Sequence, residues 1–213
     1  MEGTLTRPAA PRGAQPGDLA IIAAGTTVNL AVAATLFAAA GTDSAGTELA
    51  LRMTARVSFV WFILVFVAAP LHRLRASPAS AWLLRRRRAL GVTFGLSMAI
   101  HVGCILRLYA LHAPERPPMV TESDLFIGIP ALGLVGLLTL TSLDALKRQL
   151  SSAAWRRLHT TGIWVVWAIF FLCLVDSVGR KTTAHPVLAY HLFIAVLVIA
   201  AGLRLWSAAR QRR

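Results

Sequence analysis

The chain has 213 residues, of which 56% are hydrophobic, and a formal net charge of +13 at pH 7. This apolar share exceeds that of a soluble domain, so composition predicts an integral membrane protein in contact with lipid. The basic charge does not indicate a nucleic-acid partner, because a run such as Arg85–Arg88 between two apolar stretches is typical of a topology determinant beside anionic lipid.

Residues 1–18 are rich in Pro, Gly, Ala and Thr, which predicts a disordered cytoplasmic tail. Residues 19–206 form the predicted membrane domain, with six apolar stretches of roughly bilayer length. These are Leu19–Ala40, Val57–Leu71, Ala89–His112, Leu125–Thr141, Thr160–Val178 and Val187–Trp206. Val57–Leu71 is short for a spanning helix, but it reaches the required length if Arg52 and Arg56 lie at its outer end. The predicted fold class is all-α: a polytopic membrane protein forming a six-transmembrane-helix bundle.

The connecting segments are predicted from their composition. Gly41–Leu51 is predicted as a short external loop, Leu71–Leu84 as an internal loop, and proline-containing Ala113–Asp124 as an irregular external connector. Leu143–Leu158 combines leucines at helical spacing with basic residues, which predicts an amphipathic segment on the cytoplasmic face. Residues 207–213 form a basic cytoplasmic tail, too short for a nucleotide-binding domain.

Lysine and arginine placement predicts the orientation. With the N-terminus in the cytoplasm, 16 of the 22 lysines and arginines fall on cytoplasmic segments and six on external ones. The positive-inside rule therefore favours both termini in the cytoplasm. The first apolar stretch is the most polar, with Thr26, Thr27 and Asn29 near its middle, and these residues indicate an inward face.

Two of the six histidines lie within or at the start of apolar stretches, where burying an ionisable side chain in the membrane costs free energy. His101 lies near the middle of the third apolar stretch, and His159 lies at the start of the fifth. An ionisable side chain at membrane depth marks a functional site by default, and imidazole is a common axial ligand of haem iron. His191, about one turn inside the sixth stretch, is a reserve ligand. The remaining three are expected to have no ligand role: His72, His112 and His185.

Three short elements occur in an order that resembles a known family. They are Arg56 followed by Pro70-Leu71, Arg87-Arg88-Ala-Leu-Gly91 leading to His101, and Trp155-Arg-Arg-Leu-His159. Together they resemble the ferric reductase-like transmembrane domain superfamily over roughly residues 50–206. The strongest likeness is to the haem-binding membrane subunits of bacterial methionine-sulfoxide reductase systems.

The resemblance implies haem b, one or two per chain, and electron transfer across a bacterial inner membrane. It makes His101 and His159 haem ligands and Arg56 a partner of the haem propionates. Since propionates are anionic, Arg107 and the Arg87-Arg88 pair are further candidate partners. The chain contains no flavin or nicotinamide domain, so a separate cytoplasmic flavin or quinol donor is implied. An external acceptor, such as a periplasmic redox partner, is implied as well.

The sequence departs from the family pattern at one position. Related subunits carry a second histidine on the fifth helix, and here that position is Leu172. At 1.5 Å rise per residue, His101 and His159 differ in depth by roughly 16 Å if their helices start level. Three alternatives stay open: staggered helices with one bis-histidine haem, separate haems with a partner such as His191, or a weakened site. Cys173, 14 residues after His159, shares nearly the same helical face and is a further candidate ligand.

A rival hypothesis is a haem-free six-helix membrane scaffold or partner-binding protein. In that case His101 is a hydrogen-bonded core residue and His159 an interfacial one. A transporter is a third class, but no acidic residue lies deep in an apolar stretch, and Pro130 is the only mid-stretch proline.

Overall fold

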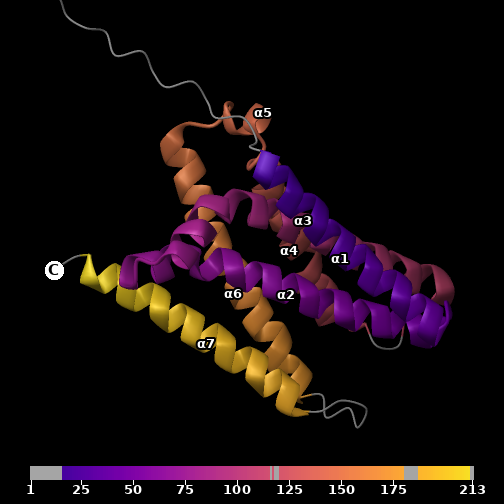
Figure 1. The fold of residues 1–213 in the computed structure, drawn as a ribbon. Coiled ribbons are helices and arrows are strands. Elements are labelled where there is room, and N and C mark those ends of the chain that lie inside the picture. Colours follow the sequence, from indigo (N-terminus) through magenta and orange to yellow (C-terminus); the bar gives the residue numbers. More distant parts are fainter. Residues whose placement is uncertain (1–15, 116, 118–119, 180–186, 212–213) are drawn as a thin grey trace, which may run out of the picture.

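The computed structural model describes residues 16–115, 117, 120–179 and 187–211, and within these residues the chain is helical and contains no strand. In Figure 1, α2 lies at the centre of the bundle and packs against α1, α3 and α7. The helices are α1 (Pro16–Ala40), α2 (Ser44–Leu74), α3 (Pro78–His112), α4 (Glu122–Leu140), α5 (Asp144–Lys147), α6 (Ser152–Gly179) and α7 (Val187–Arg210).

Five of these helices, α1, α2, α3, α6 and α7, are long and apolar enough to cross a membrane. A shorter apolar helix, Leu125–Leu140, makes up most of α4. The prediction of an all-α polytopic membrane protein is confirmed. The prediction that Val57–Leu71 extends past Arg56 and Arg52 to spanning length is confirmed, because α2 has 31 residues; α4, with 19, is the shorter element.

Two predicted loops are largely helical, because capping residues start the helices earlier than hydropathy indicates. The Asp43 carboxylate accepts a 3.0 Å hydrogen bond from the Gly46 backbone nitrogen. Most of the predicted external loop therefore belongs to α2, and Arg52 lies inside this helix. Ser77 and Ser80 form a capping box with Pro78 in the first turn, so that α3 begins inside the predicted internal loop.

The predicted amphipathic segment Leu143–Leu158 is interrupted and not one continuous helix. It divides into the short α5 and the first residues of α6. Arg88 of α3 holds α5 through a 2.9 Å salt bridge to Asp144, and Arg86 of α3 pairs with Asp18 of α1 at 2.8 Å. These pairs bring the starts of α1 and α3 together with α5. We call this end of the bundle, which carries Arg85–Arg88, the basic end.

The predicted tails lie largely outside the described residues. The described residues begin at Pro16, so most of the 1–18 segment, predicted to be disordered, lies outside them. At the other end α7 continues to Arg210, and the last two residues are not described. His185 and part of the Ala113–Asp124 connector also fall outside the described residues.

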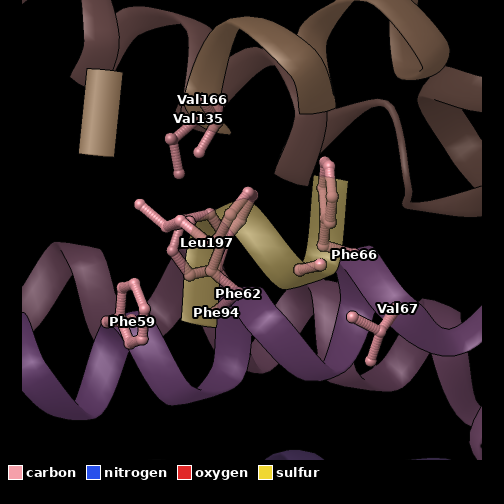
Figure 2. Packing of buried hydrophobic residues seen from close by; sticks show 9 residues of the cluster. Phe59, Phe62, Phe66, Val67, Phe94, Val135, Val166 and Leu197 are labelled. Carbon is pink, nitrogen blue, oxygen red and sulfur yellow. The ribbon is translucent and has the colours of Figure 1, made fainter. Parts of the chain in front are cut away.

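The centre of the bundle is an aromatic cluster. Phe59, Phe62 and Phe66 repeat at helical spacing on α2 and meet Phe94 of α3 (Figure 2). Val135, Val166 and Leu197 complete the cluster from α4, α6 and α7. Since lipid tails are as apolar as these side chains, close packing and polar contacts, more than burial from water, hold such helices together.

A polar contact joins α2 to α7 at a proline. Pro70 lies inside α2 and has no N–H, so the Phe66 carbonyl four residues earlier lacks its usual partner within the helix. Arg204 of α7 donates from Nη1 to this oxygen at 2.8 Å. Its guanidinium also lies 4.7 Å from the centroid of the Phe66 ring. Arg204 thus satisfies a carbonyl that proline leaves unpaired.

We expect Arg204→Ala to lower the free energy of unfolding by about 1–3 kcal/mol, because a buried carbonyl loses its donor. Thermal unfolding in detergent, followed by circular dichroism, measures the change. Arg210→Ala is the matched control, since Arg210 is exposed and lies over the Trp206 ring on the same helix. Equal destabilisation by both substitutions would contradict a specific role for the Phe66 contact.

Candidate functional site

A cavity of about 310 Å³ lies among α2, α3, α4, α6 and α7. Its walls are mostly apolar, and the lining side chains with ionisable groups are Arg52, Arg56, His101, Cys173 and Tyr190. Cofactor pockets typically enclose roughly 300–1,000 Å³ and combine apolar walls with a few polar groups. The cavity therefore has the composition of a cofactor site, with a volume at the lower end of that range.

The His101 imidazole is oriented by α2. Its Nδ1 lies 3.2 Å from the Leu51 carbonyl oxygen and 3.2 Å from Thr54 Oγ1. A carbonyl oxygen only accepts hydrogen bonds, so Nδ1 carries the hydrogen and donates it. In a neutral ring this leaves Nε2 with a free electron pair on a side chain that lines the cavity. This is the arrangement of a metal-ligating histidine, in which one nitrogen is fixed by a carbonyl and the other coordinates.

Two arginines one turn apart on α2 line the same cavity. Arg52 lies 3.6 Å from Glu48, but its Nε is buried and has no hydrogen-bond partner within the described part of the chain. Arg56 Nη1 contacts the Met53 sulfur at 3.5 Å, which is a weak acceptor. Guanidinium donors facing an apolar cavity fit an anionic carboxylate. Arg56 was predicted from the sequence as a site residue and Arg52 was not, although their four-residue spacing places both on one helical face.

The other three predicted propionate partners lie away from this cavity, and one of them, Arg88, pairs with Asp144 of α5. Arg107 donates from Nη2 to the Thr42 carbonyl at 2.5 Å and from Nε to Thr47 Oγ1 at 3.3 Å, tying the end of α3 to the α1–α2 turn. Arg87 lies toward the basic end, where it interacts electrostatically with His159. None of the three arginines is among the residues that line the cavity.

α6 and α7 present different residues to the cavity from those of the family pattern. Tyr190 and Phe193 line it from α7, whereas His191 is exposed. On α6, Leu172 is 53% exposed on the outside of the bundle, and Cys173 lines the cavity. Among the described residues, His101 is therefore the only histidine lining this cavity.

His159 lies in a separate cavity of about 70 Å³. Its Nε2 is 3.1 Å from Thr141 Oγ1, and its ring stacks on Trp155 with 4.2 Å between centroids. Trp155 in turn donates from Nε1 to the Thr141 carbonyl at 2.9 Å. The ring is thus held on one face by the indole and at one nitrogen by a hydroxyl.

Three side chains separate the two histidines. Phe94, Val135 and Val166, which belong to the buried cluster of Figure 2, line both cavities and therefore lie between them. A single haem with His101 and His159 as its two axial ligands requires both imidazoles in one space, and the structure places them in two. It therefore does not fit the staggered-helix alternative of the sequence analysis.

The donors present agree with a macrocyclic cofactor better than with a bare metal ion. Within the part of the chain that the structure describes, no three His, Cys, Asp or Glu side chains come together as a metal site. One imidazole, two arginines and apolar walls instead match an iron held by a planar ring with acidic substituents. The residues present therefore fit haem.

Comparison with known proteins points to the same family as the sequence motifs. A family model described as a ferric reductase-like transmembrane component matches residues 54–173. The matched range contains Arg56, His101 and His159 and leaves out α1 and α7. No curated protein and no solved structure gives a significant match.

Proposed function

The chain belongs to the ferric reductase-like transmembrane family, and from this premise we propose that it binds haem b and relays electrons across the membrane. A membrane electron-transfer role follows from the family. Haem binding is supported by one observation above all: His101 lines an apolar cavity with Nδ1 fixed by the Leu51 carbonyl and Nε2 left for coordination.

Each part of the cavity has a role in this proposal. His101 ligates the iron through Nε2, and Arg52 and Arg56 pair with the propionates, whose charge otherwise opposes burial. Phe59 and Phe170, which meet edge to face at 5.7 Å between centroids, exclude water from the site. When bound, haem iron supplies the one-electron change, and the surrounding protein tunes its potential through ligands, hydrogen bonds and dielectric.

The direction of transfer follows from the charge distribution. We propose that the basic end faces the cytoplasm of a bacterial cell and receives electrons from a flavin or quinol donor. The rings of Phe66, Phe62 and Phe170 contact one another in sequence, at 5.5 and 5.1 Å between centroids, and Phe170 lines the cavity. Electrons then cross a packed apolar medium before they leave to an external acceptor.

Purified protein tests the proposal directly. Protein expressed in haem-supplemented cells and extracted in detergent is expected to show a Soret band, an α band on reduction, and about one haem per chain. One haem is expected because, of the two cavities that His101 and His159 line, the one at His101 reaches the volume range of cofactor sites. Folded but colourless protein, helical by circular dichroism, would instead favour the haem-free scaffold.

A further inference from the structure

A chain of buried polar side chains lies beside His101 and joins three helices. All four members are fully buried, in a part of the bundle where an unpaired polar group is costly. We call the chain the polar ladder; its members are Asn29 of α1, Thr54 and Ser58 of α2, and Ser97 of α3.

The hydrogen bonds of the ladder have a fixed direction. Asn29 Nδ2 donates to the Gly25 carbonyl at 2.8 Å, which leaves Oδ1 to accept from Ser97 Oγ at 2.6 Å. The single Ser97 hydroxyl hydrogen is then in use. Ser58 Oγ, 2.6 Å from Ser97 Oγ, can therefore only be the donor in that pair, and it shares its hydrogen with the Thr54 carbonyl oxygen 2.9 Å away on its own helix. In each hydrogen bond that joins the three helices, the donor and the acceptor are therefore fixed.

The ladder reaches His101 through Thr54. Thr54 Oγ1 donates to the Ala50 carbonyl at 2.8 Å, so its lone pair accepts from His101 Nδ1 at 3.2 Å. Thr54 and Ser58 are one turn apart on α2, as are Ser97 and His101 on α3. The two cross-links are therefore neighbouring rungs between antiparallel helices, and rotation of α3 about its axis would break both.

We propose that the polar ladder, through Thr54, gives His101 Nδ1–H a second acceptor beside the Leu51 carbonyl and thereby lowers the reduction potential of the bound haem; this inference rests on the proposed function. When Nδ1–H donates a hydrogen bond, the electron pair of Nε2 becomes a stronger ligand for iron. A stronger ligand stabilises the ferric state. The ladder side chains act as positioning residues. Asn29 lies outside the matched range 54–173, so α1 contributes to a site that the family model does not cover.

Redox titration of the α band tests this inference. Thr54→Val removes one of the two acceptors of His101 Nδ1–H, leaves the Leu51 carbonyl in place and keeps the branched shape. It is expected to retain haem and to shift the midpoint potential in the positive direction, and Thr54→Ser is expected to restore it. Ser97→Ala and Asn29→Leu should shift the potential in the same direction by less. Thr93→Val is the matched control, because Thr93 is equally buried on α3 but donates to its own helix, to the Ala89 carbonyl at 3.0 Å.

The outcomes separate the two proposals. Wild-type protein without haem would overturn the proposed function itself. If the wild type binds haem and its potential equals that of Thr54→Val, or if Thr93→Val shifts the potential as much, the ladder has no such role while haem binding stands. Should Thr54→Val fail to fold, unchanged potentials in both Ser97→Ala and Asn29→Leu would overturn the inference equally.

Discussion

His101→Ala is expected to abolish the Soret band of the purified protein, whereas His159→Ala is expected to retain most of it. The two side chains lie in different cavities, of about 310 and 70 Å³, and only His101 has a nitrogen fixed by a backbone carbonyl beside the larger one. Loss of the one imidazole leaves the iron without a nitrogen ligand from the described lining of that cavity. The haem-to-protein ratio of each variant measures the difference.

Two controls make this comparison specific. Circular dichroism shows whether each variant keeps its helices, and added imidazole is expected to restore haem to His101→Gly by filling the position of the missing ring. Equal loss of the Soret band in the His101 and His159 variants would contradict the proposed site. It would mean that His159 also ligates iron, which requires the Phe94, Val135 and Val166 partition to open.

The helices and the main candidate ligand were predictable from the sequence for simple reasons. Spanning helices show as long apolar stretches, and His101 contrasts with the apolar residues around it. The 14-residue spacing predicts that Cys173 lies near the helical face of His159, because a regular helix turns nearly four whole times over that distance. Cys173 is exposed and contributes to the lining of the His101 cavity. Capping is a weaker signal, and the Asp43 cap that extends α2 was missed.

The details that the sequence did not provide depend on helix rotation. Tyr190 and His191 are adjacent in the mostly apolar first part of α7, so the sequence does not indicate which of them faces inward, and the structure places Tyr190 at the cavity. Arg52 was assigned to the membrane interface because Gly41–Leu51 was predicted to be a loop. Once that segment is helical, Arg52 lies one turn before Arg56 on the face that meets the cavity.

Arg52→Ala is expected to weaken haem binding by roughly 10- to 100-fold. A hydrogen bond to a charged group contributes about 1.5–3 kcal/mol, and each 1.4 kcal/mol corresponds to about a tenfold change in affinity. Arg56→Ala is expected to have an effect of similar size, since both arginines line the cavity that holds His101. Titration of haem-free protein with haemin, followed by the Soret band, gives the dissociation constants.

Arg107→Ala is the matched control for this series. Arg107 carries the same charge on α3, but its guanidinium donates to the Thr42 carbonyl and Thr47 Oγ1 and does not line the cavity. Its removal should leave the affinity unchanged if the arginines act by contact with propionates. An equal weakening in all three variants would show that overall positive charge, and not position, governs haem binding.

Arg52→Lys separates charge from geometry, because lysine keeps the charge but loses the planar, bidentate arrangement of donors that suits a carboxylate. Intermediate affinity in that variant is the expected result, with Arg52 Nε, buried and unpaired in the structure, as the donor that lysine lacks.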